Sequence, residues 1–289
     1  MIYRPQDLVS LLELEPIEKN IFRGQSRDIG TPQVFGGQVL GQALSAASCT
    51  VTGRTVHSLH AYFLKRGDVH APIIYEVDRA RDGGSFSNRR VVAIQHGEQI
   101  FNMTASFQVA EKGLEHQVAM PIVPGPDKLK DLEVLAEELA GQIPARMRKF
   151  LKWERPFHVR PVDPRHFLLH ENRVPVKQFW IRAAEVLPEN SFLHQALLTY
   201  FSDYELIATA TLPHGLDNAP DRLQMASLDH AMWFHRPVRV DEWLLFALDS
   251  PAASGGRGLV RGYVFTEAGE LVVTMMQEGL IRVRPAPTG

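Results

Sequence analysis

The sequence feature that most constrains the fold is an internal repeat. The glycine pair Gly83-Gly84 is matched by Gly255-Gly256, and the turn glycine Gly97 is matched by Gly269. The spacing is 172 residues in both cases, and the segments between these glycines correspond without a gap. An unbroken register over this length indicates a duplicated structural unit. We therefore expect the chain to build the same unit twice.

Each copy has the pattern of one helix followed by antiparallel strands. The apolar residues of the first helix, which begins at Gly36-Gly37, are Val39, Leu40, Ala43, Leu44 and Ala47. The same i, i+1, i+4, i+5 spacing recurs between Phe192 and Phe201, after Asn190 or Ser191 as N-cap. In the strands that follow each helix, apolar residues alternate with polar ones. This pattern predicts an α+β fold.

A segment of different character separates the two copies. It contains Pro121, Pro124 and Pro126, which favour extended chain, and then an amphipathic helix from Leu129 to Leu139. We predict an N-terminal unit over residues 1–112, a linker with a helix over 113–155, and a C-terminal unit over 156–289.

Composition and charge favour a small-molecule ligand. The formal net charge is −2 and no block of like charges occurs, which argues against nucleic acid or an anionic membrane as partner. The single cysteine, Cys49, cannot form an intrachain disulfide or a thiolate metal cluster. No signal-peptide core and no stretch of roughly 20 apolar residues is present. We expect a cytoplasmic protein without a membrane span, metal or cofactor.

Leu223–Arg236, with the sequence LQMASLDHAMWFHR, is the best candidate for a functional site. Polar side chains within an apolar strand are typical of an active site, but an ordinary core strand has the same pattern. The glycine pair at the start of the first helix exposes backbone N–H groups that can hold an anionic oxygen, or it is only a turn. The candidate substrate-binding residues are Gly36, Gly37, Tyr62, Phe63, Asp229, His230 and Trp233.

Longer motifs resemble the acyl-CoA thioesterase II family, the TesB-type double hotdog thioesterases. They include FGGQVLGQAL, HSLHAYFLKRGD, RDGGSFSNRRV, SLDHAMWFHRP and QEGLIR, spread from about Val34 to Arg282. The resemblance implies two tandem copies of an antiparallel sheet, each wrapped around a central helix. It also implies that the two sheets join edge to edge, which removes two exposed strand edges. A role in fatty acid metabolism and a homo-oligomer, a dimer or tetramer, are further implications.

The same resemblance implies hydrolysis of acyl-CoA to fatty acid and CoA. By motif, the catalytic residues of the family fall on Asp203, Ser227 and Gln277, with serine where many members have threonine. These side chains can together hold one water against a thioester carbon without a covalent intermediate. Ala105 stands at the place of Gln277 in the first copy, and Ala46 stands near that of Asp203. We therefore predict one active site per chain.

Other functions remain possible at this level. The alternatives are a hotdog enoyl-CoA hydratase and an acyl-CoA-binding protein without catalysis. Ser227 as a nucleophile with His230 as its base is disfavoured, because residues three apart on one strand point to opposite faces.

Overall fold

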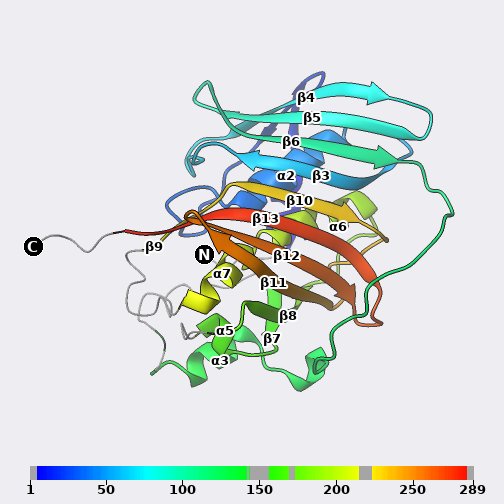
Figure 1. The fold of residues 1–289 in the computed structure, drawn as a ribbon. Helices are drawn as coiled ribbons and strands as arrows, with labels where there is room; N and C mark the ends of the chain where they lie inside the picture. Colours follow the sequence, from blue (N-terminus) through cyan, green and yellow to red (C-terminus); the bar gives the residue numbers. More distant parts are fainter. Residues whose placement is uncertain (1–4, 142, 144–155, 169–172, 215–222, 285–289) are drawn as a thin grey trace, which may run out of the picture.

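The structure is a computed structural model that describes residues 5–141, 143, 156–168, 173–214 and 223–284 (Figure 1). Its helices are α1 (Pro5–Leu12), α2 (Gly36–Ser48), α3 (Leu132–Glu138), α5 (Arg165–Leu168), α6 (Ser191–Ser202) and α7 (Leu206–Thr211), with 3-10 turns η1 (Pro126–Lys128) and η2 (Leu212–His214). Its strands are β1 (Glu15–Glu18), β2 (Ile21–Gly24), β3 (Thr55–Phe63), β4 (Ile73–Asp82), β5 (Phe86–Gln95), β6 (Glu98–Gln108), β7 (Phe157–Pro161), β8 (Val176–Ala183), β9 (Leu223–Ser227), β10 (Asp229–Phe234), β11 (Leu244–Ser254), β12 (Arg257–Thr266) and β13 (Leu271–Val283).

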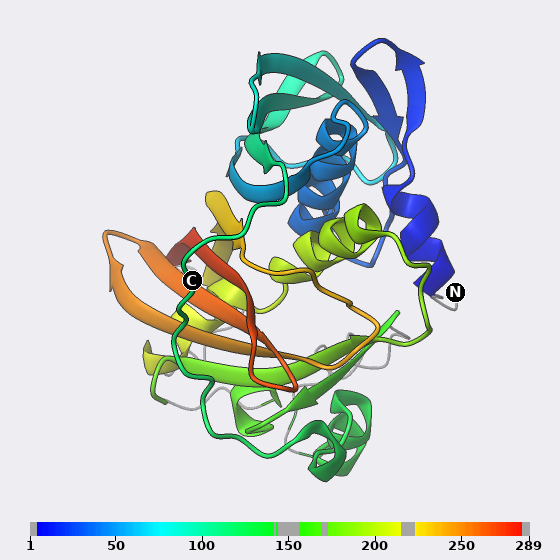
Figure 2. The same cartoon turned by 90° about the vertical axis from the view of Figure 1, so that its right-hand side faces the viewer.

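All the strands belong to one antiparallel sheet, in the order β1-β2-β4-β5-β6-β3-β10-β13-β12-β11-β8-β7, and β9 pairs with β13 beside this path. The halves from the two copies meet where β3 pairs with β10, for example His60 with Ala231. Figure 2 shows each half of the sheet curving around a helix, with α2 and α6 side by side in the middle. The predicted α+β double hotdog architecture is confirmed.

The close packing of α2 on α6 depends on glycine in the first turn of α2. A Cβ atom added at Gly37 would collide with the backbone carbonyl of Tyr200 on α6. The other helix begins with a strong cap, because the side chain of Asn190 accepts hydrogen bonds from the backbone of Phe192 and Leu193. The close approach at Gly37 lets the first turn of α2 lie against the last turn of α6.

Two local predictions are wrong. Leu223–Arg236 is not one strand, because β9 ends at Ser227 and β10 begins at Asp229. Ser227 lies opposite Gly279, whereas Ala231 lies opposite Met276. The four residue steps from Ser227 to Ala231 therefore match only three steps on β13, from Gly279 to Met276. This is the geometry of a β-bulge. The extra residue reverses the alternation, so Ser227 and His230 both face the same side.

The sequence of Lys19–Ile29 also predicts a single strand, and this second prediction is wrong. A hairpin forms instead, with β1 and β2 joined at Asn20, whose φ of 65° lies in the left-handed region. Asparagine adopts this conformation more readily than most residues, which favours the turn. The linker helix is shorter than expected, since α3 begins at Leu132. The division into residues 1–112, 113–155 and 156–289 stays a prediction, and its boundary at 155 lies outside the described residues.

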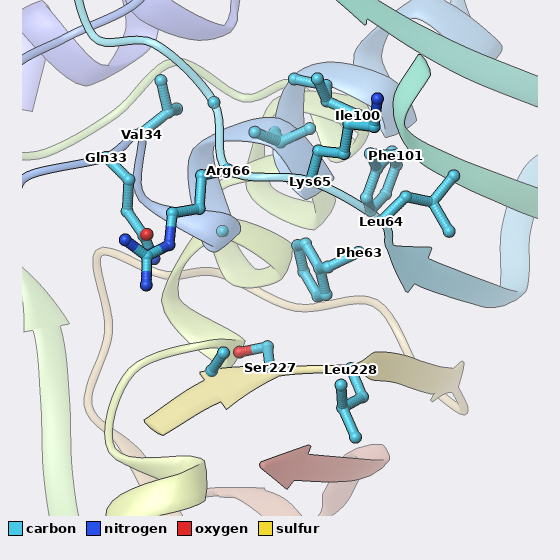
Figure 3. A pocket seen from close by; sticks show the side chains of 14 residues that line it. Gln33, Val34, Phe63, Leu64, Lys65, Arg66, Ile100, Phe101, Ser227 and Leu228 are labelled. Carbon is cyan, nitrogen blue, oxygen red and sulfur yellow. The ribbon is translucent and has the colours of Figure 1, made fainter. Parts of the chain in front are cut away.

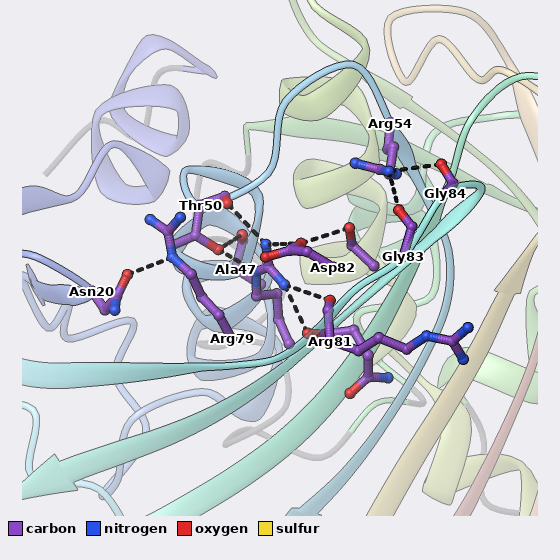
Figure 4. Close-up of polar contacts among 12 residues, drawn as sticks. Asn20, Ala47, Thr50, Arg54, Arg79, Arg81, Asp82, Gly83 and Gly84 are labelled. Atoms are coloured by element: carbon purple, nitrogen blue, oxygen red, sulfur yellow. Dashed lines mark hydrogen bonds and ion pairs between the residues drawn. The ribbon is translucent and has the colours of Figure 1, made fainter.

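In the first copy, a buried arginine lies beside Ala105, the residue that corresponds to Gln277. Arg89 lies opposite Ala105 in the pairing of β5 with β6 and is 1% exposed. Its five N–H groups have five acceptors: Thr50 Oγ1, Thr50 O, Asp82 Oδ1, Arg81 O and Asn88 O. Figure 4 shows these contacts between the end of α2 and the β4–β5 hairpin. The guanidinium group therefore ties the helix to the sheet in the first copy.

We expect Arg89→Met to lower the free energy of unfolding by about 2–3 kcal/mol, because the acceptors at Thr50 and Arg81 lose their donors. Asp82 is half exposed, so its carboxylate remains hydrated and adds little to the cost. Chemical denaturation measures the change. The exposed neighbour Arg90 provides the control, and Arg90→Met should change stability by less than about 0.5 kcal/mol. Equal effects of the two substitutions would contradict this account of Arg89.

Candidate active site

The carboxylate of Asp203 lies at the meeting point of three elements. Asp203 is the C-cap of α6, and its carboxylate accepts hydrogen bonds from Gln277 Nε2 at 2.6 Å and Ser227 Oγ at 3.3 Å. A third hydrogen bond comes from the backbone N–H of Gly37, in the first turn of α2. The donors therefore come from β13, β9 and α2. The structure brings together the three residues that the family motif singled out.

Burial dominates the electrostatics of this carboxylate. Desolvation raises the pKa of Asp203 to about 6, although the hydrogen bonds from Gln277, Ser227 and Gly37 act in the opposite direction. A carboxylate with a pKa in this range is ionised at neutral pH and is also a much stronger base than an exposed aspartate. The site can therefore accept a proton near neutral pH.

The glycine pair at the start of α2 is part of the same cluster. The sequence predicts that an anionic oxygen can be held there, and the oxygen at this helix N-terminus belongs to Asp203 itself. A Cβ atom on Gly36 would lie 2.6 Å from Asp203 Oδ2 and 3.0 Å from the ring of Phe63. Only glycine leaves room for the carboxylate at this position. The first copy thus contributes directly to a site whose side chains belong to the second.

Gln277 has one polar atom that no other group uses. Its side chain is 1% exposed, and its Nε2 atom lies 2.6 Å from Asp203 Oδ1 and 3.2 Å from His230 Nδ1. Its carbonyl oxygen, Oε1, is buried and has no hydrogen-bond partner among the described residues. An unpartnered buried acceptor beside a carboxylate is a suitable place for a water molecule.

A cavity of about 270 Å³ opens beside Ser227. Figure 3 shows the Ser227 hydroxyl below the ring of Phe63, and it shows Arg66 and Gln33 at another part of the wall. The apolar part of the lining consists of Val34, Val39, Phe63, Leu64, Ile100, Phe101, Ala226 and Leu228. Gln33, Lys65 and Arg66 supply the long polar side chains. The cavity therefore offers an apolar chamber with cationic groups in its wall.

Five of the predicted substrate-binding residues do not line this cavity: Gly37, Tyr62, Asp229, His230 and Trp233. Tyr62 is 58% exposed and pairs with Asp229 across β3 and β10, on the outer face of the sheet. Trp233 alternates to the same face and contacts the ring of His60, at 5.2 Å between centroids. Phe63, in contrast, lines the cavity. The strict alternation of a strand separates Phe63 from Tyr62, and this signal was available in the sequence.

Two residues near the site were not predicted. Ser202, fully buried at the end of α6, lies 2.9 Å from His230 Nε2 through its hydroxyl oxygen. In the sequence, only its position directly before Asp203 indicated that Ser202 lies near the site. Arg66 lines the cavity, and the basic pair Lys65-Arg66 in the first copy was the corresponding signal.

The described part of the chain has neither a metal-binding cluster nor a helix that could span a membrane. It contains no group of three or more His, Cys, Asp or Glu side chains placed to hold a metal ion. None of its helices has both the length and the apolar character needed to cross a membrane.

The chain is similar to known proteins over most of its length. The family model for acyl-CoA thioesterase matches residues 147–280, and the model for the acyl-CoA thioesterase N-terminal domain matches residues 24–108. Acyl-CoA thioesterase 2 of Haemophilus influenzae is 44% identical over 281 residues, which cover 96% of this chain and 97% of that protein. Human acyl-coenzyme A thioesterase 8 is 41% identical over 287 residues, with 96% and 89% covered.

A solved structure agrees with these matches. The crystal structure of the acyl-CoA thioesterase II TesB2 from Mycobacterium marinum has 44% sequence identity and a TM-score of 0.78, and the match covers 96% of this chain and 98% of that one. Both family models and the relatives therefore agree with the resemblance that the motifs indicate. The chain belongs to the acyl-CoA thioesterase family.

Proposed function

We propose that this acyl-CoA thioester hydrolase cleaves fatty acyl-CoA with one water held by Asp203, Ser227 and Gln277. The observation that carries the proposal is the convergence of these side chains on one buried carboxylate beside an apolar cavity. Such a water donates one hydrogen to Asp203 and the other to the unpartnered Gln277 Oε1. Ser227 donates its single hydrogen to Asp203 and so fixes the carboxylate that holds the water, and the lone pairs of the water oxygen stay free for attack.

The reaction then proceeds without a covalent intermediate. The water oxygen bonds to the thioester carbon, and one proton of the water passes to Asp203. At the same time the π electron pair of the thioester carbonyl moves onto the carbonyl oxygen. When the carbonyl re-forms, the C–S bond breaks and the CoA sulfur takes the proton from Asp203. Fatty acid and CoA leave, and the carboxylate is restored. Positioning of the water and a base with a pKa near neutral supply the rate acceleration.

The cavity suits the two ends of an acyl-CoA. Its apolar lining, including Phe63 and Phe101, provides a site for the acyl chain. Arg66 in the same wall carries the charge that binds the phosphate groups of CoA, whereas the ammonium group of Lys65 is paired with Glu98 at 2.8 Å. We propose a single such site per chain, because Ala105 and the buried Arg89 occupy the corresponding part of the first copy.

The alternative functions have less support. A hydratase needs an acid and a histidine that face the substrate together, but Asp229 accepts a hydrogen bond from the Glu278 backbone and both ring nitrogens of His230 have partners. The two hydrogen bonds of the His230 ring, with Ser202 and Gln277, also argue against Ser227 as a nucleophile activated by His230. Release of CoA thiol distinguishes an enzyme from a binding protein without catalysis. The cytoplasmic location and the homo-oligomeric assembly stay predictions.

We expect Asp203→Asn and Gln277→Ala each to reduce kcat for release of CoA thiol by about 10²–10³-fold, because each removes a group that holds the water. Release of free thiol from acyl-CoAs of graded chain length measures the effect and also gives the chain-length preference. Asp229→Asn is the control, since Asp229 lies on the outer face and should retain most activity. No thiol release by the folded, unmodified protein would support the non-catalytic alternative.

The rate should depend on the ionisation of Asp203. The base is the carboxylate, so kcat/KM should be half-maximal near pH 6, reach its plateau about one pH unit higher and fall about tenfold per pH unit well below pH 6. Burial lowers the pKa of His230 to about 3, so His230 remains neutral over this range. A pH–rate profile between pH 4.5 and 8 measures the inflection. A plateau that continues to pH 4.5 would contradict the role of Asp203 as base.

Gly36→Ala should reduce kcat about tenfold or more with little loss of stability. The added methyl group meets Asp203 Oδ2 and the Phe63 ring, so the carboxylate must move away from Gly37. The first position of a helix tolerates alanine well, which keeps the fold intact. Gly84→Ala, where a Cβ meets nothing within 4 Å, is the matched control. Full activity of Gly36→Ala would exclude the observed carboxylate position from catalysis.

A further inference from the structure

A buried histidine and a buried serine lie behind Gln277, and the hydrolytic mechanism uses neither of them. His230 is 1% exposed, Ser202 is 0% exposed, and neither residue lines the cavity. Together with Thr199 and Gln277 they form a chain of contacts that begins at the last turn of α6 and ends at Asp203. Every contact in this chain is between described residues, and its geometry fixes the direction of each hydrogen bond.

The direction is set at the helix end. The Ser202 hydroxyl donates its single hydrogen to the carbonyl of Thr199 at 2.8 Å, one of the four carbonyls that the end of α6 leaves without an intrahelical partner. Towards His230 Nε2, at 2.9 Å, the hydroxyl oxygen is therefore an acceptor. The proton of the neutral imidazole lies on Nε2, and its Nδ1 atom carries a lone pair.

This lone pair selects one orientation of the Gln277 amide. Nδ1 accepts a hydrogen bond from the amide NH₂ at 3.2 Å, and the second N–H of the same group reaches Asp203 Oδ1 at 2.6 Å. A rotation of the amide by 180° would place Oε1 against two acceptors, the carboxylate and the imidazole lone pair. In the observed orientation Oε1 is free to accept a hydrogen bond from water.

We propose that His230, held in one tautomer by Ser202, is a positioning residue that fixes the orientation of the Gln277 amide. The inference rests on the proposed function, because it assigns Gln277 Oε1 to the attacking water. The first copy supports the pairing of the two residues. In the second copy, His230 and Gln277 lie next to the Ala231–Met276 pair on β10 and β13. In the first copy, Leu59 and Ala105 form the corresponding pair on β3 and β6. The copy without the amide therefore has Leu59 where the other copy has His230.

A double-mutant cycle tests this role directly. In the otherwise unmodified protein, His230→Leu should reduce kcat about tenfold to a hundredfold, with KM changed less than about threefold. His230→Asn should recover most of the loss, because its Oδ1 atom accepts from the amide at about the place of Nδ1. In a Gln277→Ala background, His230→Leu should cause no further loss, since its effect passes through the missing amide.

The contrary results are equally specific. If His230→Leu reduces kcat by the same factor in both backgrounds, His230 has a structural role or acts by itself, and the inference is overturned. Thermal unfolding of each variant identifies those that fail to fold. If His230→Leu does not fold, Ser202→Ala in the two backgrounds carries the same comparison.

A measurement without substrate separates this inference from the proposed function. In protein labelled with ¹⁵N-histidine, NMR should show His230 with a protonated Nε2 and an unprotonated Nδ1 between pH 5 and 8. Ser202→Ala should allow the other tautomer to appear. Observation of a protonated Nδ1 in the unmodified protein would overturn the inference even if the enzyme is active. The expected tautomer in a protein that releases no thiol would uphold the hydrogen-bond chain while the hydrolytic function fails.

Discussion

The structure depends on one buried carboxylate that three different elements hold. Asp203 belongs to the second copy of the repeat, but the backbone N–H that caps its charge belongs to Gly37 of the first. A charge removed from water is tolerated only when it is well hydrogen-bonded, so the helices must meet at this point. The tight approach of α2 to α6, which requires glycine at the first turn of α2, is therefore a condition for the site as well as for the core.

The duplication allows the two copies to differ in role. Only the second carries Gln277 and His230, whereas the first has Ala105 and Leu59 on the paired strands and encloses Arg89, whose donors are all satisfied. The first copy still supplies Gly36, Gly37 and much of the cavity wall. A single site is thus built from both halves, and loss of the polar groups in one half does not remove that half from function.

Much of this arrangement could be predicted from the sequence. The 172-residue spacing indicated two copies, the apolar spacing located α2 and α6, and the family motifs pointed to Asp203, Ser227 and Gln277. The bulge at Leu228 could not be predicted, because it depends on the pairing of β9 and β10 with β13. It turns Ser227 and His230 to the same side, against the simple rule of alternation. The amide of Gln277 is likewise oriented by residues distant in sequence, so no local sequence pattern could predict its free oxygen.

The central claim is that a water, positioned by Asp203, Ser227 and Gln277, attacks the thioester directly at one site per chain. A crystal structure of the Asp203→Asn protein with an uncleaved acyl-CoA tests it most directly. We predict one ligand per chain in the cavity, with a water in contact with Gln277 Oε1 and about 3–3.5 Å from the thioester carbon. A covalent bond between the acyl carbon and Ser227, or a ligand bound in the first copy beside Ala105, would contradict the account.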